Sequence, residues 1–189
     1  MILLPGYGTR IPNLVAARHR RRLAAELDPL SGVRAELARV RLGRLSELTV
    51  RMAALERQIG ALVGDHPLLA LPGVRALTAG RLIAETGDVR RFRSADAFAM
   101  LTGTAPIPAS SGQTVRVRLN RGGNRRLNRA LHSIALAQST HHPAARAYVA
   151  RKLAEGKTSR DAIRCLKRHL ARVVYRVLRS AAVPVELAA

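Results

Sequence analysis

The sequence predicts a mainly α-helical fold, in which a coiled-coil helix precedes a helical domain with a helix-hairpin-helix and one small β-hairpin. Apolar residues form 48% of the 189 residues but only five are aromatic, and a core of Leu, Val and Ala is typical of helices packed on helices. Most apolar residues recur at helical spacing, whereas residues 115–119 alternate between apolar and basic side chains as a half-buried strand does.

Turn residues and changes of period divide the chain into four segments. The first contains several Pro and Gly residues without a sustained period, and Pro29 and Gly32 interrupt the helical pattern of the second. The predicted segments are an irregular leader (1–17), a basic helical and coiled-coil segment (18–64), a C-terminal domain with the helix-hairpin-helix (65–180) and a tail (181–189).

A heptad pattern runs through the second segment, with apolar residues spaced 3-4-3-4-3. These residues are Leu45, Leu48, Met52, Leu55, Ile59 and Leu62. Three heptads fit a coiled coil between two copies of the chain, and they fit a helical hairpin inside one chain equally well. Self-association through this helix therefore stays open.

Helix start and stop signals define the elements that follow. Ser94 is the predicted cap of a short helix over 95–101, and Asn124 opens a helix that runs to about Thr140. Pro143 starts the next helix, Gly156 ends it, and Thr158 caps the last one. The buried stripe predicted for the last helix is Ile163, Leu166, Leu170, Val173, Val174, Val177 and Leu178.

The charge of the chain indicates a polyanionic partner. There are 33 Lys and Arg residues against 12 Asp and Glu residues, a formal net charge of +21. No apolar run approaches the length of a membrane-spanning helix, so nucleic acid is favoured over a membrane. Cys165 is the only cysteine and is expected to be a structural thiol, and the absence of a signal sequence predicts a cytoplasmic protein.

Hydroxyl and basic residues gather between Thr102 and Arg126. Ser110 and Ser111 precede Gly112, where the backbone can bend, and a hydroxyl beside several arginines fits attack on a phosphodiester. Arginines at a helix start are unfavourable for the helix dipole unless an anion lies there. The predicted nucleic-acid contacts here are Arg116, Arg118, Arg121, Asn124, Arg125 and Arg126.

A second candidate contact is the stretch Leu-Pro-Gly-Val-Arg at 71–75. An apolar–Pro–Gly–apolar turn before a helix is typical of the hairpin in a helix-hairpin-helix, where glycine allows a close approach to a phosphate. Pro72, Gly73, Val74 and Arg75 are the predicted contacts, and an ordinary helix connection is the alternative. His132, His141 and His142 lack neighbouring acidic ligands, and we expect no metal site.

Four motifs in order resemble the C-terminal domain of the insertion-sequence one-ten family of transposases. They are Leu-Pro-Gly-Val with Glu-Thr-Gly-Asp-Val-Arg-Arg-Phe, then Gly-Thr-Ala-Pro with Ser-Ser-Gly, then Arg-Gly-Gly-Asn-Arg-Arg-Leu-Asn-Arg-Ala-Leu, then Leu-Lys-Arg-His-Leu-Ala-Arg-Val-Val-Tyr. The similarity runs from about 67 to 179, and the upstream coiled coil, from about Arg18, also resembles that family.

This resemblance implies a DNA recombinase guided by a structured RNA. It makes Ser111 the nucleophile, and it assigns the helix-hairpin-helix to Pro72, Gly73 and Val74. The family also has an acidic RuvC-like domain with four metal-binding acids, which this sequence lacks. We therefore expect no cofactor in this chain, Mg²⁺ only together with that missing domain, and a truncated transposase that is inactive alone.

Two functions follow from the sequence. The first is the catalytic-serine part of a transposase, which cleaves and rejoins DNA through a phosphoserine link. The alternative is a non-catalytic basic module that binds nucleic acid or regulates an intact transposase, in which Ser110-Ser111-Gly112 is only a turn. Whether the chain is an enzyme is left open at this point.

Overall fold

The computed structural model describes residues 14, 16–108, 117–120 and 122–182, which form two units. The units are 1–58 and 59–189, so the division lies inside a long helix and before the predicted boundary at 64. Ser111, Arg116 and Arg121, as well as most of the predicted leader and tail, lie outside the described residues.

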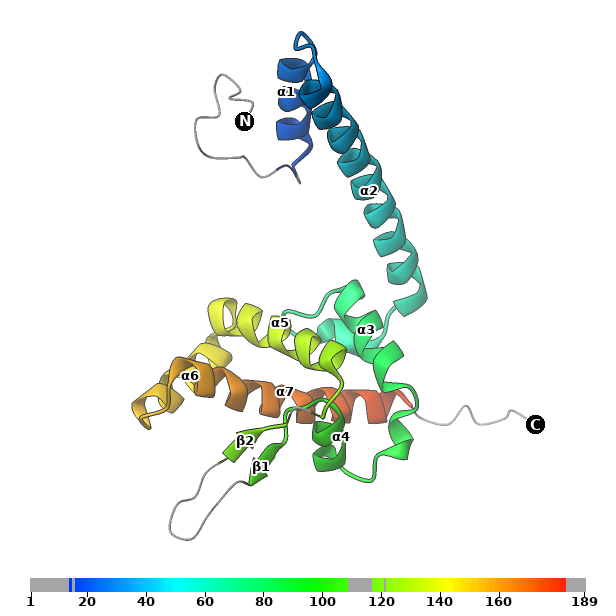
Figure 1. Ribbon diagram of the computed structural model, residues 1–189. Helices are drawn as coiled ribbons and strands as arrows, with labels where there is room; N and C mark the ends of the chain where they lie inside the picture. The colour runs from blue at the N-terminus through cyan, green and yellow to red at the C-terminus, as the bar shows by residue number, and fades with distance from the viewer. Residues whose placement is uncertain (1–13, 15, 109–116, 121, 183–189) are drawn as a thin grey trace, which may run out of the picture. The chain divides into compact units, whose positions relative to one another are not determined.

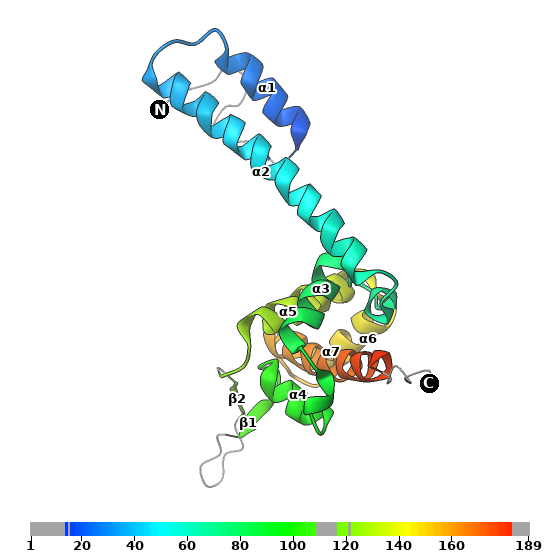
Figure 2. The same cartoon turned by 90° about the vertical axis from the view of Figure 1, so that its right-hand side faces the viewer.

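The first unit is built from helix α1 (Ala17–Leu27) and the larger part of helix α2 (Val33–Val63). The helices separate at the Pro and Gly residues that predicted a break, and α1 lies alongside the first turns of α2 (Figure 2). Arg39 Nη1 donates to the carbonyls of Leu27 (2.7 Å) and Leu30 (3.0 Å), which fastens the end of α1 to α2. The start of α2 thus forms an intramolecular hairpin.

The heptad positions further along α2 remain open to solvent in this structure. Leu48, Met52 and Leu55 are 42%, 61% and 48% exposed, so α1 does not cover them. A coiled coil between chains stays a prediction.

The described residues of the second unit form helices, 3₁₀ turns and one antiparallel strand pair (Figure 1). Helix α7 is its central helix, because it contacts α4, α5, α6 and both 3₁₀ turns, while α3 packs against α5. The elements are η1 (Pro67–Ala70), α3 (Ala76–Thr86), η2 (Val89–Arg91), α4 (Ala95–Leu101), β1 (Pro106–Pro108), β2 (Val117–Leu119), α5 (Arg125–His141), α6 (Pro143–Ala154) and α7 (Ser159–Ala181).

The core lies where α7 packs against α4 and α5 and where α3 packs against α5. Phe98 is fully buried, and its ring packs edge-on against Phe92 at 5.6 Å between centroids. The Tyr175 hydroxyl donates to the Phe92 carbonyl over 2.8 Å. Of the predicted α7 stripe, Leu166, Leu170, Val174 and Leu178 are buried, whereas Ile163, Val173 and Val177 are partly buried.

Side-chain caps begin the helices where the sequence predicted them. Ser94 Oγ accepts the Ala97 amide (3.1 Å), and Thr158 Oγ1 accepts the Asp161 amide (3.2 Å). Gly156 has a φ of 81° just beyond α6, the left-handed conformation typical of a helix end. These predicted helix boundaries are confirmed.

The small β-structure is also present. Strands β1 and β2 pair antiparallel, with Pro106 opposite Leu119 and Pro108 opposite Val117, so the described strand covers the last three residues of the predicted 115–119 strand. A helix-hairpin-helix is not confirmed, since a single 3₁₀ turn, η1, precedes the Pro-Gly turn and α3. No helix among the described residues has the length and apolarity needed to cross a membrane.

Candidate nucleic-acid interface

The start of α5 is held by Asn124, which bonds in three directions. Its Oδ1 accepts the amides of Arg126 (2.8 Å) and Leu127 (3.1 Å), which caps the helix. Its backbone amide donates to the Leu101 carbonyl at the end of α4 (2.6 Å), and its Nδ2 donates to Glu85 Oε2 on α3 (2.7 Å). Asn124 therefore fixes three helices at one point, which gives this predicted contact residue a structural role.

Glu85 supplies a negative charge beside this helix start. Hydrogen bonds from Asn124 and then from Arg126 hold the pKa of Glu85 below its ordinary value. Arg126 Nη1 lies 3.0 Å from Glu85 Oε1, although the Arg126 side chain is 78% exposed. The sequence predicted an anion near these arginines, and the carboxylate of Glu85 in the chain itself is one such anion. It pairs with Arg126, whereas no ion pair of Arg125 or Arg129 is found among the described residues.

Two glycines bring α4 and α5 together. Gly103 has a φ of 66°, and a Cβ placed on Gly123 would overlap the backbone of Gly103. Asn120 strengthens this contact, because its Nδ2 donates to the Met100 carbonyl (3.0 Å) and its Oδ1 accepts the Gly122 amide (3.0 Å). A glycine at position 123 is therefore required for this close backbone packing.

Beside this contact lies a pocket of about 580 Å³, here called the basic pocket. Its lining residues are Gly103, Asn120, Gly123, Arg125, Asn128, Arg129, His132 and Lys167. Three of them are cations and two are amides, while none is acidic. Arg125 and Arg129 are exposed, and no carboxylate partner of either side chain is present among the described residues. The pocket is suited to an anion.

Lys167 and Asn128 are site residues that sequence reasoning missed. Lys167 is 9% exposed, and its Nζ donates to Asn128 Oδ1 over 2.7 Å. A signal was available, because Lys167 stands directly after Leu166 and three residues before Leu170 on the apolar stripe of α7, where a lysine is unusual. Asn128 lies four residues after the cap and gave no separate signal.

The two predicted contact regions lie at opposite ends of α5. Gln138 Nε2 donates to the Pro72 carbonyl over 2.6 Å, near the C-terminal end of α5. Asn124 and Gln138 are separated by about 21 Å along the helix at a rise of about 1.5 Å per residue. The structure therefore does not bring the Pro-Gly turn to the basic pocket.

The Pro-Gly turn, which precedes α3 in sequence, packs against α5. A Cβ on Gly73, whose φ is 79°, would lie 3.2 Å from Ala137 Cβ, and Val74 is buried with 7% exposure. Arg75 is exposed and stands at the N-cap of α3 without a side-chain cap bond. Packing against α5 accounts for Gly73 and Val74, and contact of this turn with nucleic acid stays a prediction.

Strand β2 leads from the undescribed 109–116 segment to the basic pocket. Arg118 lies in β2 opposite Ile107 of β1, and Asn120 directly after the strand lines the pocket. The paired strands thus bring the chain on both sides of Ser111 back to one place. Catalysis by Ser111, and contacts from Arg116 and Arg121, stay predictions.

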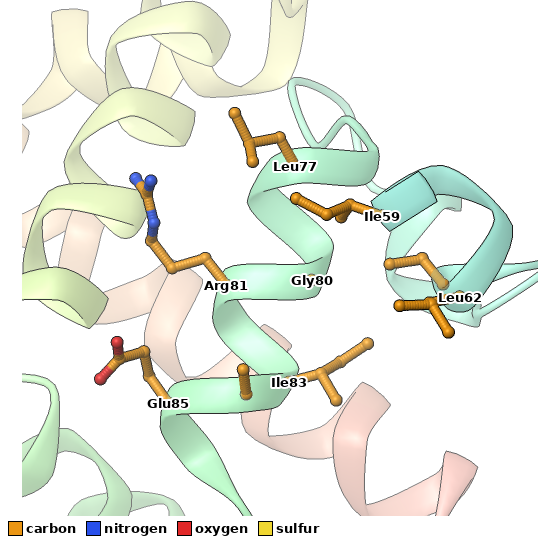
Figure 3. A pocket seen from close by; sticks show the side chains of 9 residues that line it. Ile59, Leu62, Leu77, Gly80, Arg81, Ile83 and Glu85 are labelled. Carbon is orange, nitrogen blue, oxygen red and sulfur yellow. The ribbon is translucent and has the colours of Figure 1, made fainter. Parts of the chain in front are cut away.

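The other features of the unit suit a polyanion less well. An apolar groove of about 490 Å³ lies between the end of α2 and α3, lined by Ile59, Leu62, Leu77 and neighbouring residues (Figure 3). Arg81 and Glu85 project to the side of α3 that faces away from Leu62 (Figure 3). Within the described ranges no three His, Cys, Asp or Glu residues form a group that could hold a metal ion.

Comparison with known proteins places the region around this pocket among insertion-element proteins. Residues 65–150 match the model of the Transposase IS116/IS110/IS902 family, which confirms the resemblance. Residues 65–150 therefore carry the domain that the model of this family describes.

The curated relatives are considerably longer than the region that matches. The chain is 40% identical over 131 residues to the 43.6 kDa protein of insertion element IS110 from Streptomyces coelicolor, which covers 67% of this chain and 32% of that protein. It is 36% identical over 118 residues to the 42 kDa protein of insertion element IS900 from Mycobacterium paratuberculosis, which covers 61% and 30%. It is 38% identical over 99 residues to a probable family 20 transposase from Pseudomonas aeruginosa, which covers 50% and 29%. The chain spans about a third of the length of these relatives.

Proposed function

We propose that this chain binds the DNA backbone through the basic pocket and acts in DNA transposition as the C-terminal part of a transposase. The observation that carries the proposal is the pocket itself, where Arg125, Arg129 and Lys167 converge without an acidic lining residue, inside a domain of a transposase family. Cations gathered beside a helix start attract phosphates and release counterions from DNA.

The proposed chemistry is strand cleavage by Ser111. Its Oγ gives up its proton and forms a bond to a DNA phosphorus atom while the bond from phosphorus to the neighbouring nucleotide oxygen breaks. That leaving oxygen takes up a proton, so the step consumes and releases no net proton. The phosphoserine diester keeps the phosphodiester bond energy, so rejoining to another strand needs no nucleoside triphosphate. Nearby arginines stabilise the charge of the pentavalent phosphorus centre.

The second candidate function is a non-catalytic module that coats nucleic acid or regulates a full-length transposase. The charge of +21 supports this function equally, because phosphate contacts require no nucleophile. In this case the chain binds DNA, and Ser111 makes no covalent bond to it.

Detection of a covalent protein–DNA adduct on a denaturing gel separates the two functions. The purified chain is incubated with DNA and Mg²⁺, with and without the acidic domain of a full-length homologue, and Ser111→Ala is compared with its neighbour Ser110→Ala. An adduct that persists in Ser110→Ala and disappears in Ser111→Ala supports the nucleophile. Salt-sensitive binding without an adduct under any condition supports the non-catalytic module.

Two further partners belong to this proposal. A structured guide RNA would compete with DNA for the same cations, and a second copy of the chain would cover Leu48, Met52 and Leu55 on α2. Light scattering of the wild-type chain and of Met52→Glu tests the second partner: a dimer that dissociates in the variant supports the coiled coil, and a wild-type monomer at high concentration contradicts it.

A further inference from the structure

Lys167 is a nearly buried cation without a counterion among the described residues. The chain contains only three lysines, Lys152, Lys157 and Lys167, and the first of these pairs with Glu155 while the second is exposed. Lys167 is 9% exposed, and the hydrogen bond that the structure gives its Nζ goes to the neutral amide of Asn128. Lysines are almost never buried unless they are paired, so this ammonium lacks the anion that usually accompanies it.

Asn128 holds the ammonium in a fixed place. Its Nδ2 donates to the carbonyls of Thr102 (2.8 Å) and Gly103 (3.2 Å) at the end of α4, which turns its Oδ1 toward Lys167. An ammonium has three N–H donors, and this bond uses one of them. Because Lys167 lines the basic pocket, two donors remain for a ligand there.

The surroundings of Lys167 select for an anion with several oxygens. Arg125 and Arg129 line the same pocket and have planar forks of donors that match phosphate oxygens. Desolvation of the ring and then the charge of Lys167 lower the pKa of His132, so this imidazole stays neutral near pH 7 and adds no further charge. Burial, and then the charge of Arg164, lower the pKa of Lys167, and a bound anion would oppose that shift.

We propose that the basic pocket receives one phosphate group of a nucleic-acid strand, with Lys167 as the fixed contact and Arg125 and Arg129 as contacts at the opening. This inference rests on the proposed function and narrows it. The arginines of the surface contact a backbone that can shift along them, whereas a lysine positioned by Asn128 holds one phosphate in register. Base identity plays no part in this contact.

Lysine labelling of the full chain, read by mass spectrometry, tests the pocket with internal controls. The probes are inorganic phosphate, a short single-stranded oligodeoxynucleotide, and the same oligonucleotide with neutral methylphosphonate linkages, all at matched ionic strength. At about ten times the Kd, mass action leaves about a tenth of the pocket free, so labelling of Lys167 should fall roughly tenfold with the charged strand. Labelling of Lys157 in inorganic phosphate should stay unchanged.

Three outcomes would overturn the inference. If Lys167 is not labelled in the free protein, its ammonium group is not accessible from the pocket. Equal protection by the charged and neutral strands would exclude a phosphate contact. Protection by inorganic phosphate without protection by the oligonucleotide would make the pocket a site for the free ion.

A pair of variants separates this inference from the proposed function. Lys167→Met and Lys157→Met remove the same charge, and circular dichroism establishes that each is folded. The inference predicts that inorganic phosphate raises the unfolding temperature of Lys157→Met but not that of Lys167→Met. If phosphate stabilises both variants, the inference is wrong. If the wild-type chain binds DNA with steep salt dependence while Lys167 stays unprotected, only the inference fails. If the chain does not bind DNA, the proposed function fails as well.

Discussion

Asn124 donates its Nδ2–H to Oε2 of Glu85 over 2.7 Å, and this bond joins the first turn of α5 to the last turns of α3. The same side chain caps α5 with its Oδ1, so one residue serves helix capping and tertiary contact together. Glu85 in turn accepts from Arg126, which makes it the charge that organises this helix start.

Glu85 should make the fold sensitive to acid. Its pKa in the folded protein is lowered, so the folded state releases the proton more readily than the unfolded state. The stabilisation is therefore present above the ordinary value of 4.5 and is lost as pH falls below it through the lowered pKa. Thermal unfolding followed from pH 7 to about pH 3 should show a smaller loss in Glu85→Gln than in the wild type. Glu47→Gln, on the surface of α2, serves as control, and an equal change in both variants would argue against Glu85.

Gly123→Ala should destabilise the second unit. The added Cβ would overlap the backbone of Gly103, and backbone cannot move aside as a flexible side chain can. We expect a loss of about 1–3 kcal/mol in the free energy of unfolding, as is typical of overpacking. Gly60→Ala is the matched control, because its Cβ would meet Ala76 Cβ at an ordinary 3.8 Å and a helical Ala gains up to about 1 kcal/mol over Gly. Chemical denaturation measures the free energy of unfolding of both variants, and equal values for Gly123→Ala and Gly60→Ala would contradict this prediction.

The double variant Arg125→Ala, Arg129→Ala should weaken DNA binding equally for all sequences. Contacts with phosphates carry no sequence information, so the loss of affinity should be the same for every DNA sequence. Each phosphate contact that is lost should make the slope of log affinity against log salt shallower by about one. Fluorescence anisotropy over a salt series measures this slope, and the wild-type affinity should itself fall by orders of magnitude for ~6–8 phosphate contacts. The double variant Arg34→Ala, Arg41→Ala removes the same charge from exposed positions on α2. Equal losses in the two variants would mean that net charge, and not the basic pocket, governs binding.

Local rules were sufficient for the helix boundaries but not for the site. Ser94 and Thr158 were recognisable as caps because each bonds to an amide three residues further along the chain. The bonds from Asn124 to Glu85 and from Lys167 to Asn128 each join residues 39 positions apart. No periodicity encodes such pairs, since they depend on how α3, α5 and α7 pack.

The Pro72–Gly73 turn shows how one sequence pattern fits two structures. A glycine with positive φ permits a phosphate to come close, and it permits a helix to come close for the same reason, the missing Cβ. Here the neighbour on that side is α5, through Ala137 and the bond from Gln138 to the Pro72 carbonyl. Sequence alone contains the need for close approach but not the identity of the partner.

The contact of Gly103 with Gly123 also has a consequence for the chain between them. Gly103 follows α4 and Gly123 precedes α5, so the contact between these two glycines brings both ends of the intervening segment together. Bringing the two ends of a free segment of this length together would cost roughly 3 kcal/mol in chain entropy. The packing of α4 against α5 compensates for this loss. The close packing of α4 against α5 therefore rests on Gly103 and Gly123, at the two ends of this segment, and makes no use of Ser111.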